Sequence, residues 1–207
     1  MKKQAGFTLV EIAIVMVIIG LLLGGVLKGR GLIVSAKIRN IENEFNGLSA
    51  AVYSYQDRYL VLPGDDDRAN RFTDIASPCT TDCGDRNGII GGDFNSTTDT
   101  DESRLFWLHL RNAGLIKGAK TDKTQPLNRF NGQIGVATGT GTAIADVTIQ
   151  REFIGFTRIP QEVARSLDER GDDGLSASGS IKGLKNDGST SAGDYVTDEL
   201  YHLYFSM

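Results

Sequence analysis

Cysteine, histidine and proline are scarce in this chain, whose 207 residues include two, two and four of them. With only Cys79 and Cys83, the chain is not a disulfide-dense scaffold, and two cysteines alone do not complete a zinc site. No proline precedes Pro63. Because proline is the strongest helix breaker, its absence from the first 62 residues permits one long helix there.

Residue patterns that would support catalysis are also lacking. His109 lies in an expected helix with Leu105 and Leu108, and His202 alternates with aromatic residues in an expected strand. We interpret both as structural histidines. No serine or cysteine motif provides a nucleophile, and the glycine-rich stretch 139–141 lacks the strand, lysine and helix of a phosphate loop. The sequence therefore predicts that the protein is not an enzyme.

Basic charge is not in excess. The chain has 22 basic and 26 acidic side chains, which gives a formal net charge of −4. The residues after Pro63 contain neither a basic run nor basic residues interleaved with aromatic ones. This composition argues against general nucleic-acid binding, which depends on a basic surface.

A long apolar run is the strongest positive signal. Between Phe7 and Leu27, 21 consecutive residues include only two with polar side chains, Thr8 and Glu11. At about 1.5 Å per residue, a helix of this length crosses a bilayer core of roughly 30 Å. We therefore expect a transmembrane helix. A carboxylate in such a helix is rare and costly, so Glu11 is a candidate functional residue that needs a cationic partner.

A short basic segment, residues 1–6, precedes the apolar run and contains Lys2 and Lys3. The positive-inside rule places this segment in the cytoplasm and the residues after Leu27 on the other side of the membrane. An ordinary secretory signal is cut after its apolar region, which is discarded. A cut after Gly6 would instead keep the apolar run in the mature protein.

The order of basic leader, Gly6, Phe7, the residues Thr-Leu-Val and then Glu11 resembles the prepilin leader of type IV pilins and type II secretion pseudopilins. The resemblance implies cleavage between Gly6 and Phe7 by a prepilin peptidase, N-methylation of Phe7 and a role for Glu11 in assembly. It also implies an inner-membrane assembly platform as a partner. The precursor would lie in the bacterial inner membrane with its head in the periplasm, and the product would be an extracellular filament or a periplasmic pseudopilus.

The chemistry of Glu11 can be argued independently of this resemblance. Cleavage after Gly6 would create an α-amino group on Phe7 with a pKa of about 8, which is cationic at neutral pH. If helices pack side by side, Glu11 of one copy can neutralise this amino group on a neighbour. The pair would then favour one axial stagger between copies, so we expect Glu11 to set the register of assembly.

Beyond the span, apolar residues recur at intervals of three and four, which is typical of one face of a helix. These residues are Ile38, Ile41, Phe45, Leu48, Val52, Tyr55 and Tyr59. The sequence Leu62-Pro63-Gly64 ends the pattern. Many major pilins have a proline within the span, and this chain has none there. We predict one spine helix of about 53 residues, roughly 80 Å long, that packs on a sheet.

The remaining residues predict an α+β head with an antiparallel sheet. Helices are expected over residues 101–113 and from Pro160 to Asp168, and strands over 144–150, 152–158 and 200–205. Trp107 is expected in the core. The predicted organisation is a leader at 1–6, a transmembrane half of the spine helix at 7–27, an amphipathic half at 28–62 and a globular head at 63–207.

A cluster of cysteine and acidic residues stands out in the head. Cys79 and Cys83 are expected to form a disulfide, because they lie beyond the membrane where thiols oxidise. The stretch that follows is rich in short oxygen side chains, which suit calcium. The candidate ligands are Asp82, Asp85, Asn87 and Asp93. Asp, Asn and Gly also favour turns, so the stretch can equally be a series of turns. A weaker calcium candidate is formed by Asp168, Asp172 and Asp173.

Two functions from different classes remain open. The first is a structural subunit of a type IV pilus or similar filament, either a major pilin, a minor pilin or a pseudopilin, which forms homo-oligomers or assembles with other pilins. The second is a monomeric membrane-tethered module whose acidic loops bind calcium or a surface ligand. Cleavage after Gly6 is expected only for the first function.

Overall fold

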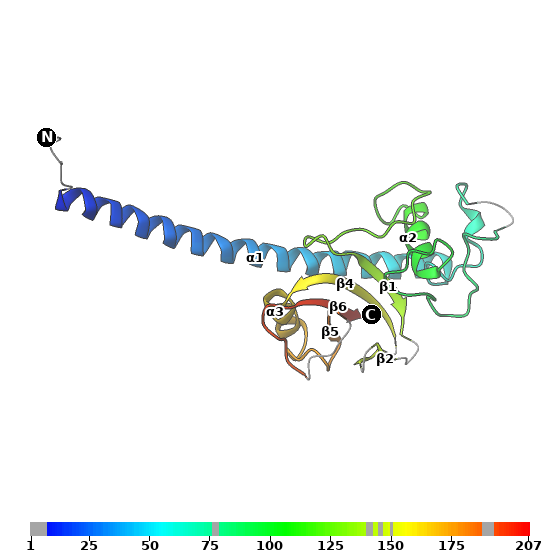
Figure 1. Ribbon diagram of the computed structural model, residues 1–207. Helices are drawn as coiled ribbons and strands as arrows, with labels where there is room; N and C mark the ends of the chain where they lie inside the picture. Colours follow the sequence, from blue (N-terminus) through cyan, green and yellow to red (C-terminus); the bar gives the residue numbers. More distant parts are fainter. Residues whose placement is uncertain (1–7, 76–78, 140–142, 145–146, 150, 188–192) are drawn as a thin grey trace. The chain divides into compact units, whose positions relative to one another are not determined.

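The computed structural model of the chain describes residues 8–75, 79–139, 143–144, 147–149, 151–187 and 193–207 (Figure 1). Its contacts divide the chain into two units, Met1–Arg39 and Asn40–Met207. The second unit contains the end of the long helix, both shorter α-helices and all the strands.

A single helix, α1 (Leu9–Tyr59), accounts for 51 residues. It ends where Leu60 adopts a left-handed conformation with a φ of 58°, while the Leu60 N–H still donates to the carbonyl of Gln56 at 2.8 Å. Pro63 follows soon after, so the helix does not resume. The predicted spine helix is therefore present.

Four antiparallel strands form a sheet in the order β1-β4-β6-β5. They are β1 (Ile134–Thr138), β4 (Glu152–Pro160), β5 (Ile181–Lys185) and β6 (Leu200–Ser206). β4 is central: Ile154 pairs with Val136 of β1 on one side and with Phe205 of β6 on the other. A long helix with an antiparallel sheet is the α+β class that the sequence predicts.

The two faces of the sheet are covered by different segments. On one face, the ring of Phe205 lies 5.0 Å from that of Phe45 in α1 and 5.4 Å from that of Phe156. On the other face, the ring of Tyr204 lies 5.1 Å from that of Phe94, in the loop before α2. Neighbouring residues of a strand point to opposite faces, so β6 contributes Phe205 to one core and Tyr204 to the other. The end of α1 lies along the first face (Figure 1).

Loops cover both edges of this sheet. On β1, the Thr138 N–H donates to the carbonyl of Ile90 at 3.1 Å. On β5, the Gly183 N–H donates to the carbonyl of Ser176 at 2.8 Å. Edge strands with unpaired N–H groups can pair with strands of other chains. Here the loops already bind some of these N–H groups.

Residues 60–133 connect α1 to β1 and contain a short 3₁₀ helix, η1 (Ala69–Arg71), and α2 (Glu102–Asn112). α2 lies within the predicted range 101–113. Trp107 in α2 is fully buried, so its predicted place in the core is confirmed. Gly114 follows with a φ of 70°, which ends the helix.

The second predicted helix is α3 (Gln161–Gly171). Pro160, expected as its first residue, is instead the last residue of β4 and the N-cap of α3, because its fixed φ also suits a strand end. The single strand predicted over 144–150 is wrong. Two short antiparallel strands, β2 (Ala143–Ile144) and β3 (Val147–Thr148), pair with each other instead, and residues 145–146 and 150 lie outside the described residues.

Candidate functional site

Glu11, the predicted assembly residue, lies in the first turn of α1 and is hydrogen-bonded to Thr8. Glu11 Oε2 accepts hydrogen bonds from the Thr8 N–H and the Thr8 hydroxyl, both at 2.8 Å. The Glu11 N–H donates to Thr8 Oγ1 at 3.2 Å. This reciprocal pair is a capping box, which satisfies N–H groups that the first helical turn leaves open. Gly6 and Phe7, the predicted processing residues, lie outside the described residues.

The surface around Glu11 is apolar and exposed. Among the described residues, α1 is the one helix long and apolar enough to cross a membrane, and none of its apolar window is buried. Leu9, Leu21 and Leu27 keep 85%, 73% and 69% of their surface exposed. An apolar surface of this extent is covered in use by lipid or by protein.

Cys79 and Cys83, which were predicted to form a disulfide, are joined by one with an S–S distance of 2.06 Å. Both cysteines are partly buried against the apolar cluster that includes Ile75 and Leu108. The closed loop presents the carbonyl of Asp82 to His109 Nε2 at 2.7 Å. The disulfide loop is thereby tied to α2.

Two of the predicted calcium ligands, Asp82 and Asp85, have different hydrogen-bond partners. The Asp82 carboxylate accepts from the Lys123 ammonium group at 2.7 Å, and the Asp85 carboxylate accepts from the Asn87 side chain at 2.9 Å. Among the described residues, two groups of three acidic, histidine or cysteine side chains have ligand atoms within 4.8 Å of one another. Neither Asp82 nor Asp93 belongs to such a group. Calcium binding at these residues stays a prediction.

Asp85 instead lies beside Asp65 and Glu102, with one oxygen of each within 4.8 Å of the others. Asp65 accepts two main-chain N–H groups of the loop 84–91 at 2.8 and 2.9 Å, and Glu102 accepts two more at 2.7 and 3.0 Å. Burial raises the pKa of both Asp65 and Glu102, and these N–H donors oppose the rise. The two carboxylates hold the loop through its main chain.

Asp66 is fully buried and forms a network that sequence analysis missed. Its carboxylate accepts from the Tyr55 hydroxyl at 2.6 Å and from the Arg68 N–H at 2.9 Å, and the Arg71 guanidinium contacts both of its oxygens. Burial opposes ionisation of Asp66, but these donors outweigh it and lower the pKa of the carboxyl. The only sequence signal is the buried face on which Tyr55 lies, since no local spacing connects it to Asp66.

His109 is buried beside this network. The Gly64 N–H donates to His109 Nδ1 at 2.9 Å, and the ring is stacked on that of Tyr55 at 6.4 Å. An Nδ1 that accepts a hydrogen bond is unprotonated, and Nε2 then donates to Asp82. Burial lowers the pKa of His109, so the ring stays neutral at pH 7. These contacts give His109 the structural role that was predicted for it.

The second acidic group, Asp168, Asp172 and Asp173, lies at the end of α3. The Asp168 carboxylate is fully buried and accepts from the Tyr195 hydroxyl at 2.6 Å. Asp173 accepts from the Ser178 hydroxyl at 2.6 Å. Asp168 and Asp172 also accept the main-chain N–H groups of Gly174 and Ile181 at 3.1 and 3.0 Å, so they hold the connection from α3 to β5 as Asp65 and Glu102 hold the loop 84–91.

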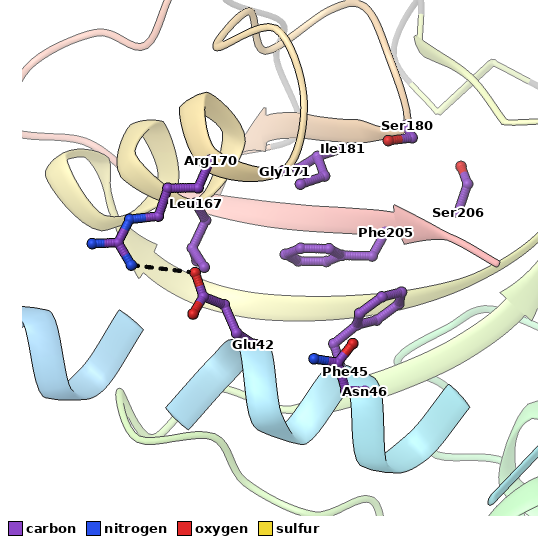
Figure 2. Close-up of a pocket in the computed structure, with 10 residues that line it drawn as sticks. All are labelled: Glu42, Phe45, Asn46, Leu167, Arg170, Gly171, Ser180, Ile181, Phe205 and Ser206. Carbon is purple, nitrogen blue, oxygen red and sulfur yellow. Dashed lines mark hydrogen bonds and ion pairs between the residues drawn. The ribbon is translucent and has the colours of Figure 1, made fainter. Parts of the chain in front are cut away.

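A cleft of about 250 Å³ lies between α1, α3 and the strands β5 and β6 (Figure 2). Phe45, Leu167 and Phe205 supply apolar lining. Glu42 of α1 and Arg170 of α3 face each other across it, with 3.4 Å between their charged groups. Both side chains of this ion pair are more than a third exposed, so it is weak.

Residues 1–27 match the family described as the prokaryotic N-terminal methylation motif. This is the prepilin-type motif of type IV pilins and pseudopilins. The match includes Gly6, Phe7 and Glu11 and ends at Leu27, where the apolar run ends. No curated protein and no solved structure matches the chain.

Proposed function

We propose that this protein is a structural subunit of a type IV pilus or a pilus-like filament, cleaved after Gly6 and N-methylated at Phe7. The observation that carries the proposal is the prepilin-type motif at residues 1–27, continued by an exposed apolar helix. Before assembly, lipid covers this helix. In the filament, the same helices of neighbouring copies cover it, with the head outside. Pilins and pseudopilins are structural rather than catalytic, in agreement with the lack of catalytic motifs.

Glu11 has two partners in this proposal. In the monomer, its carboxylate is hydrogen-bonded to Thr8, which reduces the cost of a charge in an apolar helix. In the filament, the amino group of Phe7 on a neighbouring copy becomes the second partner. The carboxylate therefore supports both states, and only the filament provides it with a cation.

Two variants separate the cap from the charge. Glu11→Gln keeps a side chain that can complete a capping box but removes the charge, whereas Glu11→Leu removes both. We expect both variants to insert in the membrane and both to lose at least tenfold in filament yield. Filament yield is measured by quantifying the chain in sheared surface fractions against its amount in membranes. Wild-type yield from Glu11→Gln would show that capping alone explains Glu11.

The experiment that tests the whole proposal is quantitative mass spectrometry of filaments sheared from the native host. We expect a chain that begins at methylated Phe7. A dominant chain is a major pilin, a trace chain with the same N-terminus is a minor pilin, and a processed chain retained in the membrane is a pseudopilin. A chain that keeps residues 1–6 contradicts the proposal and favours a monomeric tethered module.

A further inference from the structure

Charge is unevenly distributed along α1. Residues 12–41 contain four basic side chains and no acidic one. The last two, Lys37 and Arg39, are called the basic pair below. The next charged residues, Glu42 and Glu44, are called the acidic pair, and each lies five positions after one member of the basic pair.

The acidic pair is only partly neutralised within its own copy, where Arg170 contacts Glu42 and the positive charge of Arg129 acts on Glu44. Glu42 lines the cleft with a partly exposed side chain, and its partner Arg170 is 3.4 Å away and itself half exposed (Figure 2). Oε2 of Glu44 is buried and has no hydrogen-bond partner in the part of the chain that the structure describes. Arg39 is exposed. Packing of copies side by side would remove water from these charges, which is unfavourable unless opposite charges meet.

The register proposed for Glu11 brings opposite charges together. Pairing of Glu11 with the amino group of Phe7 on a neighbour displaces the two copies by four residues. α1 is one continuous helix, and the acidic pair lies five positions after the basic pair. A displacement of four residues therefore leaves an axial offset of one residue, about 1.5 Å, between the basic pair of one copy and the acidic pair of the other. Long side chains easily span that difference.

The members of each pair also point in different directions. Residues two positions apart on a helix are separated by about 200°, because each residue turns the helix by about 100°. The basic pair therefore offers charges on nearly opposite sides of α1, and the acidic pair does the same. Among these four side chains, Arg39 is the exposed one.

We propose that the basic pair of one copy forms ion pairs with the acidic pair of a neighbouring copy in the filament. This second contact, between Lys37 or Arg39 and Glu42 or Glu44, acts in the same register as the contact of Glu11. The inference rests on the proposed function, because it requires copies that pack through α1. The partner is a second copy of this chain, and an anionic lipid surface is the alternative that the test excludes.

Crosslinking tests the contact directly. Chains carrying Arg39→Cys and chains carrying Glu42→Cys, distinguished by mass, are expressed together in the native host with the wild-type chain absent. We expect disulfide-linked heterodimers of the two chains in sheared filaments on non-reducing gels. The matched control is Arg58→Cys with Glu42→Cys, since Arg58 lies on the exposed side of the same helix, 16 residues away from Glu42. Filaments that contain both chains of the first combination without linked heterodimers would overturn the inference.

Charge reversal tests whether the contact between the basic pair and the acidic pair is needed for filament assembly. We expect Arg39→Glu to lower filament yield at least tenfold while the amount of processed chain in the membrane is unchanged, and Arg58→Glu to leave both unchanged. An unchanged yield for Arg39→Glu overturns the inference. A parallel fall in membrane level also overturns it, because Arg39 would then serve lipid anchoring. If wild-type chain is absent from filaments, the proposed function itself fails, which is a separate result.

Discussion

Buried polar side chains organise the region between α1 and α2. Asp66 receives hydrogen bonds from Tyr55, Arg71 and a main-chain N–H, and His109 joins Gly64 to the disulfide loop. Neither contact was predictable, because Tyr55 meets Asp66 only across the turn at Leu60, and His109 contacts residues that lie 45 and 27 positions before it in the sequence. Glu11 was found from sequence because a lone charge in an apolar run is visible without a fold.

Replacement of Asp66 tests the first of these networks. Asp66→Asn removes the charge that faces the Arg71 guanidinium, and we expect the free energy of unfolding to fall by about 2 to 3 kcal/mol, below the usual range for a broken buried ion pair because Arg71 is partly solvated. Chemical denaturation measures it. The control is Asp67→Asn, whose exposed carboxylate lies 3.4 Å from Arg86 and should contribute less than about 0.5 kcal/mol. Equal effects of the two variants would contradict this account.

His109 makes stability depend on pH. Its pKa is lower in the folded state than the ordinary value of about 6.5, because burial disfavours the charged ring. The unfolded chain therefore binds more protons below pH 6.5, and stability is full above that pH and falls below it, by up to about 1.4 kcal/mol per pH unit.

The variant His109→Gln isolates this effect. The raised pKa values of Asp65 and Glu102 act in the opposite direction, but they are present in both proteins and cancel in the comparison. We expect the wild type to lose more stability than His109→Gln between pH 7 and pH 5, measured by denaturation at each pH. Parallel curves would exclude a role for this histidine.

At the scale of elements, the sequence predicts helices better than strands. α1, α2 and α3 carry clear periodicity and end signals. β1 and β5 were not predicted, because each contains a glycine, Gly135 or Gly183, and no strict alternation. In β1 the glycine is required: a Cβ on Gly135 would lie 1.8 Å from the carbonyl oxygen of Phe94. The loop that contains Phe94 therefore packs directly against the main chain of β1 at Gly135, the residue that lowers the strand propensity of β1 in the sequence.

Two glycine substitutions should have opposite effects. Gly135→Ala forces the Phe94 loop away from the sheet, and we expect a loss of about 3 kcal/mol or more, within the range for severe packing mutations. Gly47→Ala, in α1 where nothing lies within 4 Å of the added Cβ, should gain up to about 1 kcal/mol through helix propensity. Thermal or chemical unfolding of the two variants checks both signs. A mild effect of Gly135→Ala would mean that the loop moves freely.

At the scale of the whole molecule, apolar and basic residues are concentrated near the N-terminus and acidic residues in the rest of the chain. The N-terminal half of α1 is apolar and then basic, whereas the rest of the chain is acidic: residues 40–207 contain 25 of the 26 acidic side chains. The α+β class, the apolar segment and the motif at residues 1–27 were all visible in the sequence. The arrangement of residues 60–133 was not, because main-chain hydrogen bonds to a few carboxylates define it.

Membrane extraction tests the exposed apolar surface of α1. We expect the chain to stay in the membrane pellet after washes with high salt and with alkaline carbonate, and to dissolve only in detergent, because the apolar surface of residues 9–27 is buried in lipid. Western blots of pellet and supernatant measure this, with a soluble periplasmic protein as the control. Release by carbonate would contradict a transmembrane α1.

The loop 84–91 is held by carboxylates outside it, which grip its main-chain N–H groups. Within the loop, the Asp85 and Asn87 side chains accept the N–H groups of Asn87 and Ile89 at 3.1 and 2.8 Å, and the side chain of Ile90 is buried. Gly84 is constrained as well, because a Cβ there would lie 2.4 Å from the Cα of Asp65. We expect substitutions at exposed positions that make none of these contacts to leave the scaffold intact. The exposed positions of this loop can therefore change in sequence while the same fold is retained beneath them.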